Sequence, residues 1–170
     1  MSVPHGNVLQ SFDRASLERH GFVGWLSFPE VRESSLCPTS GGVYVVIYEC
    51  QNPTTFPATS PAGRHKGKDP TASIAALTAN WVAGAEVVYI GKGDELRRRI
   101  VQFARFGEGK NSGHSGGRLI WQLPRPDLLK IAWKETPGSV PVEVEAELIA
   151  SFREQYGKPP FANNPHMLGR

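Results

Sequence analysis

A glutamate in the segment 141–156 occupies a position where an apolar residue is expected. The segment has the periodicity of a helix, and four residues form its apolar stripe: Leu148, Ile149, Phe152 and Tyr156. Glu145 falls in the middle of that stripe, whereas the other glutamates of the segment lie on the opposite face, as solvated acids do. A buried carboxylate without a partner is costly. We therefore expect Glu145 to have a partner.

An arginine breaks the pattern of a second predicted helix, 95–106. Four residues form its apolar face: Leu96, Ile100, Phe103 and Phe106. Arg99 lies within that arc, and two interpretations are open. Arg99 and Glu145 form a salt bridge or extend to solvent at the rim of the core. Alternatively they converge in a polar cleft, where a guanidinium that grips phosphate oxygens and a carboxylate that holds Mg²⁺ would suit phosphate chemistry.

Strands and helices alternate along the chain that must position these two charges. Runs of β-branched and aromatic residues predict strands at 42–49, 86–91 and 128–135. Helices are predicted at 11–21, 71–82, 95–106 and 141–156, with Asp94 as the cap of the third and Gly157 ending the fourth. Three strands and several helices indicate a small α+β domain, with a loop and a helix between the first two strands.

The composition fits one folded domain of 170 residues, with 39% hydrophobic and 21% charged residues. The net charge of +3 permits a polyanionic partner without requiring one. The sequence has no run of 18 apolar residues, and residues 1–21 lack the apolar core of a secretory signal, so we expect a cytoplasmic protein without a membrane partner. Cys37 and Cys50 lack metal-site spacing; a reduced pair is favoured, and a disulfide stays open.

Five short segments, in order, resemble the GIY-YIG nuclease family. Residues 42–44 (Gly-Val-Tyr) and 89–91 (Tyr-Ile-Gly) resemble its paired signature, and Arg99 follows Tyr89 by ten residues as in the family. Glu145 lies in a segment similar to the family's glutamate-bearing helix, and 158–163 resembles its closing Pro-then-Asn segment. The resemblance implies a mainly antiparallel three-stranded sheet flanked by helices. It also implies a nuclease domain at 41–170, with residues 1–40 as an extension packed on it.

The family resemblance implies metal-dependent hydrolysis of DNA phosphodiester bonds. Glu145 would bind one ion per site, Mg²⁺ or Mn²⁺, without a small-molecule cofactor. Arg99 would clamp the phosphate. Tyr44 and Tyr89 would lie side by side at the attacking water, and one of them would act as general base. Because the pKa of a free tyrosine is about 10, it must be lowered, and Lys92 is the expected cation.

Three features depart from the family pattern. The segment 50–85 inserts a basic loop and a helix between the tyrosine motifs. Phe103 occupies a position where several members have His or Tyr. His114, from a glycine-rich loop, either replaces that residue or is a turn residue. Asn163 is expected to hydrogen-bond within the site, but the adjacent Asn164 could fill the same role.

Contacts with DNA beyond the site would come from basic residues of two loops: Arg64, His65, Lys66, Lys68, Arg105, Lys110 and Arg118. Each of these basic residues, taken alone, is equally well explained as a solvated surface charge with no role in DNA binding. Two other functions stay open: a catalytically silent module that binds nucleic acid or protein on the same scaffold, and an unrelated phosphate-handling enzyme that uses His114 at a helix start. The sequence does not separate restriction, repair and mobile-element roles, nor does it give the oligomeric state.

Overall fold

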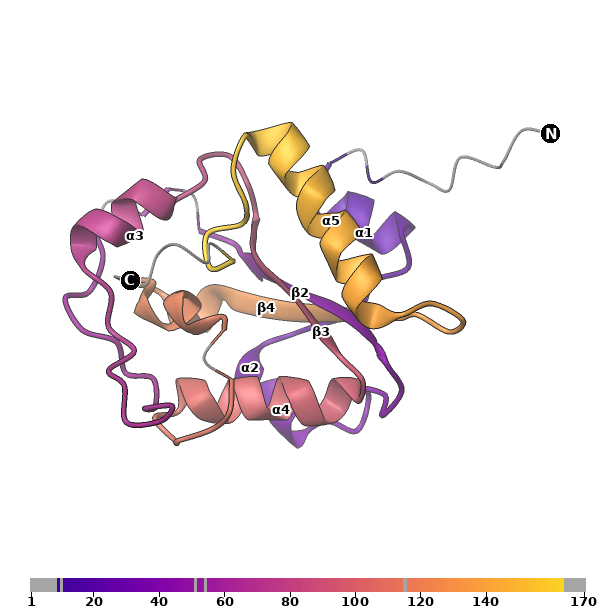
Figure 1. Cartoon of the computed structure of the whole chain (residues 1–170), viewed down its shortest axis with the longest axis horizontal. Coiled ribbons are helices and arrows are strands. Elements are labelled where there is room, and N and C mark those ends of the chain that lie inside the picture. The colour runs from indigo at the N-terminus through magenta and orange to yellow at the C-terminus, as the bar shows by residue number, and fades with distance from the viewer. Residues whose placement is uncertain (1–8, 10, 51, 54, 115, 164–170) are drawn as a thin grey trace.

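The computed structural model describes residues 9, 11–50, 52–53, 55–114 and 116–163 (Figure 1). The strands are β1 (Val23–Leu26), β2 (Gly42–Tyr48), β3 (Val87–Gly93) and β4 (Leu129–Glu135). The helices are α1 (Arg14–Arg19), α2 (Phe28–Glu33), α3 (Ile74–Asn80), α4 (Leu96–Gly107) and α5 (Pro141–Tyr156). Two short 3₁₀ helices, η1 (Arg118–Gln122) and η2 (Pro126–Leu128), precede β4.

The four strands form one antiparallel sheet in the order β1-β4-β2-β3. The α+β class is confirmed, whereas the prediction of three strands is corrected to four. The additional strand, β1, comes from the first forty residues and pairs with β4. It carries no alternating pattern, because Gly24 and Trp25 have φ of 113° and 57° and the register shifts there. The backbone of Gly24 packs against the Trp133 ring, where a Cβ would clash.

The strand β2 is buried along its whole length because a separate core covers each of its faces. Tyr44, Val46 and Tyr48 belong to the core shared with α2 and α4. The alternate residues, from Val43 to Ile47, belong to the core shared with α1 and α5. Figure 1 shows α4 and α5 on opposite sides of the strands. A side chain on β2 or β3 therefore points toward one helix or the other.

The helices that carry the two unexpected charges begin and end close to their predicted limits. Pro141 opens α5, and Gly157 ends it with a φ of 81°. The predicted cap of α4 was wrong, because Glu95 is its N-cap and no side chain caps it. Instead, the Leu96 and Arg97 N–H groups donate to backbone carbonyls of the segment before β2. This contact satisfies the first turn of α4 without Asp94.

The segment inserted between β2 and β3 contains the predicted helix, α3, and is held by a buried glutamine. Gln122 of η1 accepts a hydrogen bond from the Ala72 N–H and donates to the carbonyls of Ala72 and Pro57, each at 2.9 Å. No disulfide joins Cys37 and Cys50. Among the described residues, no helix has both the length and the apolar character that crossing a bilayer requires.

Candidate active site

The two motif tyrosines lie on neighbouring strands and point to the α4 side of the sheet. Tyr44 of β2 is paired with Gly91 of β3, and Tyr89 is paired with Val46. Their ring centroids are 6.0 Å apart. Gly91 is required beside Tyr44, because a Cβ at position 91 would occupy the space of the Tyr44 ring. The sheet register therefore brings together the two tyrosines that are 45 residues apart in the sequence.

A buried histidine contacts the first of these tyrosines. The Tyr44 hydroxyl and the His114 Nε2 atom lie 2.5 Å apart, and both side chains are fully buried. The imidazole stacks on Phe103, with 3.9 Å between ring centroids and an interplanar angle of 4°. His114 thus lies over the side chain at position 103, where the resemblance led us to expect a His or Tyr. The structure therefore places His114 beside the tyrosine pair and not in an exposed turn.

The environment keeps His114 neutral. Burial, followed by the charge of Arg99, lowers its pKa to about 3. Its Nδ1 atom is buried and has no hydrogen-bond partner among the described residues. His114 is fully buried. An unrelated phosphate-handling enzyme that uses His114 at a helix start would need this side chain to face its anion, so full burial argues against that function.

The tyrosines differ in their access to the surface. Tyr44 is 0% exposed and Tyr89 is 7% exposed. Burial, followed by the neighbouring Tyr89, raises the pKa of Tyr44 well above its usual range. Burial, followed by the Glu145 carboxylate, raises the pKa of Tyr89 to about 12. Both hydroxyls are therefore protonated at neutral pH, and Tyr89 is slightly the more exposed of the two residues.

Arg99 of α4 lies within electrostatic reach of the whole group. A Cβ at Gly93 would be 2.9 Å from the Arg99 Cβ, so this glycine allows α4 to approach the end of β3. The Arg99 Nη1 atom donates to the Gly113 carbonyl and to the Gln102 Oε1 atom, both at 3.4 Å. Burial has the largest influence on four neighbouring pKa values, and the charge of Arg99 lowers all four: those of Tyr44, Tyr89, His114 and Glu145.

Glu145 of α5 lies half-buried beside this group, although α5 covers the opposite face of the sheet. Burial raises the pKa of Glu145, while the charges of Lys92 and Arg99 lower it. Its own charge raises the pKa of both Tyr44 and Tyr89. The charges of Arg99 and Glu145, placed by periodicity in the apolar stripes of two helices, thus influence the same two tyrosines.

Lys92 lies on the other side of the strand from Tyr89. It is paired with Val43, whose side chain faces the α5 core, so Lys92 also points to that side. Its charge lowers the pKa of Glu145, whereas the influences on Tyr89 are burial, Glu145, Arg99 and Tyr44. The expectation that Lys92 lowers the pKa of a tyrosine is therefore corrected: Lys92 acts on Glu145.

Asn163 forms hydrogen bonds with the unpaired edge of β3 at Ile90, the residue that follows Tyr89. Its Oδ1 atom accepts from the Ile90 N–H and its Nδ2 atom donates to the Ile90 carbonyl, both at 2.8 Å. The Ala162 N–H also donates to the Val88 carbonyl. Asn163 thus holds the strand that carries Tyr89. Asn164, the other candidate, lies outside the described residues.

The donor set suits a hard cation that keeps most of its own water. Among the described residues, no three His, Cys, Asp or Glu side chains gather as they do in an all-protein metal cage. Mg²⁺ is commonly held by one or two carboxylates together with substrate phosphates and water. Glu145 is a half-buried carboxylate flanked by the cations Lys92 and Arg99, which would face a phosphate rather than compete for the ion. The residues present therefore fit Mg²⁺ or Mn²⁺.

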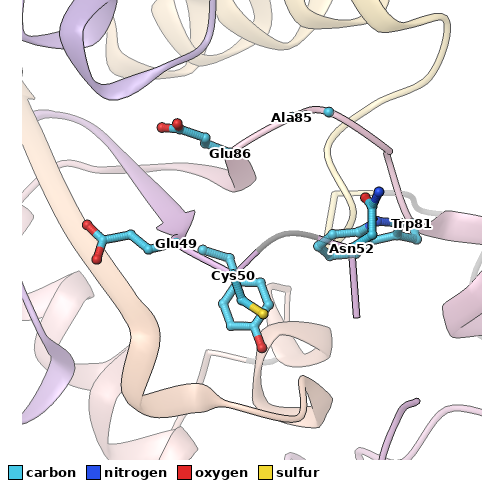
Figure 2. Close-up of a pocket in the computed structure, with 8 residues that line it drawn as sticks. Glu49, Cys50, Asn52, Trp81, Ala85 and Glu86 are labelled. Atoms are coloured by element: carbon cyan, nitrogen blue, oxygen red, sulfur yellow. The ribbon is translucent and has the colours of Figure 1, made fainter. Parts of the chain in front are cut away.

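Two other regions lie apart from this group. A cavity of about 400 Å³ lies at the far end of β2, and Figure 2 shows Glu49 and Glu86 at its margin. Arg14 already pairs with Glu49 at 3.6 Å, and its N–H donates to Glu86 at 3.2 Å. In the inserted loop, Arg64 pairs with Asp69 at 3.8 Å on the surface. The expected DNA contacts from that loop stay predictions.

Sequence reasoning missed Gln122, which anchors the inserted loop, and the stacking role of Phe103. A single glutamine in a short apolar run gives no periodic signal, and a phenylalanine in an apolar stripe is expected to be core. No protein-family model, curated protein or solved structure matches this chain.

Proposed function

We propose that this protein is a metal-dependent endonuclease that hydrolyses DNA phosphodiester bonds with a site of the GIY-YIG type. The proposal rests on one observation: side chains from distant segments of the chain converge at one place. They come from β2, β3, α4, α5 and the loop before η1. The Tyr44 and Tyr89 rings lie 6.0 Å apart, His114 contacts Tyr44, Glu145 and Arg99 act electrostatically on Tyr89, and Lys92 and Arg99 act on Glu145. A core needs no such gathering of an arginine, a lysine and a carboxylate around two tyrosines.

Tyr89 is the better candidate for the general base. Tyr89 is the more exposed residue of the two, while Tyr44 is fully buried and engaged with His114. Tyr89 must lose its proton more readily than its pKa of about 12 allows. The Glu145 charge raises that pKa, so neutralising the carboxylate favours ionisation of Tyr89. Arg99 lowers the same pKa and is free of any carboxylate ion pair among the described residues.

The remaining residues would hold the scissile phosphate, the divalent cation and the strand β3. Arg99 would bind the scissile phosphate and stabilise the charge that develops on it. Glu145, with Lys92 beside it, would hold the divalent cation. When bound, such an ion supplies Lewis-acid polarisation of the phosphate and offsets the charge of the leaving oxygen. Asn163 keeps Ile90, and hence Tyr89, in place.

A matched pair of variants tests the proposal. Glu145→Gln removes the half-buried carboxylate, whereas Glu147→Gln changes an exposed carboxylate on the same helix. We expect purified protein to nick or cut plasmid DNA with Mg²⁺ or Mn²⁺, and Glu145→Gln to lose this activity while Glu147→Gln keeps it. Undiminished cutting by Glu145→Gln would refute the proposed site. Mapping of the cut positions distinguishes a fixed short sequence, as in restriction, from structure-dependent nicking.

One observation favours a second function, a module that binds nucleic acid without cutting it. Tyr44 is sealed from solvent, and both tyrosines are hard to ionise. Such a module would bind DNA in EDTA and would cleave no substrate with any divalent metal. A Tyr89→Phe variant then behaves like the wild type, whereas for the nuclease it loses about 10²-fold or more of the rate.

A further inference from the structure

Arg118 differs from Arg97, Arg98 and Arg99 of α4 in having no acceptor among the described residues. The Arg97 guanidinium donates to the Cys37 and Ser35 carbonyls, and Arg98 pairs with Glu95 at 3.8 Å. Arg99 donates to Gln102 and Gly113. The Arg118 Nε atom is buried and has no hydrogen-bond partner in the part of the chain that the structure describes. Within the described part of the chain, Arg118 also forms no ion pair and lies over no aromatic ring.

This absence is unusual because the guanidinium is partly removed from water. Arg118 is half-buried, and burial is the influence that lowers its pKa, with no carboxylate to offset it. A buried donor without an acceptor is costly, and a charged donor more so. The rest of the Arg118 side chain is partly exposed, so an anion from outside could supply acceptors to the guanidinium. The planar fork of arginine matches the oxygens of a phosphate.

The position of Arg118 in the chain indicates which anion it would bind. It opens η1 directly after Gly116 and Gly117, whose backbone lies against the Tyr89 ring. A Cβ at Gly116 would be 3.4 Å from the Tyr89 hydroxyl, and a Cβ at Gly117 would be 3.1 Å from the Cζ atom of the same ring. Arg99 contacts Gly113 at the beginning of this loop. Arg99 hydrogen-bonds to Gly113 and Arg118 follows Gly117, so both arginines adjoin the glycine-rich segment whose Gly116 and Gly117 lie against Tyr89.

We propose that Arg118 binds a second backbone phosphate of the DNA strand, next to the phosphate held at Arg99. The inference rests on the proposed function, and it adds a subsite whose ligand is a phosphodiester that is not cut. Arg99 fixes the reacting phosphate and Arg118 fixes its neighbour, so the strand is held at two points across Tyr89. Such contacts carry no base specificity; they set the register of the strand over the site.

The salt dependence of DNA binding tests this subsite without requiring cleavage. The full-length chain with Glu145→Gln is titrated into a fluorescent duplex in EDTA, and log K is plotted against log salt concentration. Adding Arg118→Gln is expected to reduce the slope by about 0.9, the value for one lost phosphate contact on duplex DNA. Arg118→Lys is expected to keep most of the slope with weaker binding, because the charge remains without the fork. The control, Arg153→Gln, changes an exposed arginine of α5 and is expected to keep the parental slope.

The possible results distinguish a failure of the Arg118 subsite from a failure of the proposed nuclease function. A folded Arg118→Gln protein with the parental slope overturns the subsite and leaves the nuclease proposal standing. A parent chain that binds no duplex at any salt concentration overturns both. If Arg118→Gln does not fold, the parent itself is measured by NMR, with the Arg118 Nε–H resonance assigned from its loss in Arg118→Lys. The resonance is expected to shift on addition of the duplex, and a resonance that stays unmoved at saturation overturns the subsite.

Discussion

Lowering the pH is expected to destabilise this protein through His114. Burial lowers the pKa of the native imidazole to about 3, whereas the unfolded chain titrates near 6.5. Between these two values the unfolded state binds a proton that the native state does not, so stability falls as the pH falls. The slope approaches about 1.4 kcal/mol per pH unit. Between about pH 7.5 and pH 4.5, the loss due to His114 is therefore about 2–3 kcal/mol.

The assay is urea unfolding of the wild type and of His114→Gln at several pH values in this window. The variant is less stable throughout, but its stability is expected to fall less steeply because the titrating group is gone. Comparing the two proteins removes the contributions of groups that both retain. His20, whose pKa burial also lowers, acts in the same direction as His114, and Glu145, whose pKa burial raises, acts in the opposite direction. Parallel curves of stability against pH for the two proteins would refute a buried, neutral His114.

Three further outcomes follow from the site. Tyr44→Phe leaves the buried Nε2 atom of His114 without its partner and is expected to lower the free energy of unfolding by about 1–3 kcal/mol in urea titrations. Asn163→Ala frees the N–H and carbonyl of Ile90 at the open edge of β3, and is expected to speed amide hydrogen exchange at Ile90 more than at the central strand β2. Under the proposed function, EDTA abolishes plasmid cleavage and excess Mg²⁺ restores it; cutting that continues in EDTA would remove the metal from the mechanism.

Periodicity predicted the two charged residues because their signal is local. In a helix, a charge inside an apolar stripe is visible from the spacing alone, and Glu145 and Arg99 were found in this way. The strands β2, β3 and β4 were predicted for the same reason, since each is a continuous run of residues suited to a sheet.

The parts that sequence reasoning could not fix depend on contacts between distant segments. The strand β1 has four residues and a positive φ at Gly24, so only its pairing with β4 makes it a strand. The role of His114 depends on a loop that brings its ring over Phe103, and nothing in the glycine-rich sequence specifies that position. Lys92 is different, because the alternation of side chains along β3 already places it on the face opposite Tyr89, and its closeness to Tyr89 in the sequence is what made it the expected cation.

The order of the strands explains how charges from opposite faces of the sheet can act on one site. Tyr89 and Arg99 lie on the α4 side, while Lys92 and Glu145 lie on the α5 side, yet Glu145 raises the pKa of Tyr89. A central strand would separate these groups by further strands, but β3 is the edge strand of the sheet, and its last residues include Gly91 and Gly93. Because Gly93 has no side chain, α4 brings Arg99 close to the end of this edge strand, and Gly91 leaves room for the Tyr44 ring beside it. The two glycines of β3 and its edge position are thus as necessary to the site as the charged residues, and a side chain at Gly93 is expected to displace Arg99 before it unfolds the sheet.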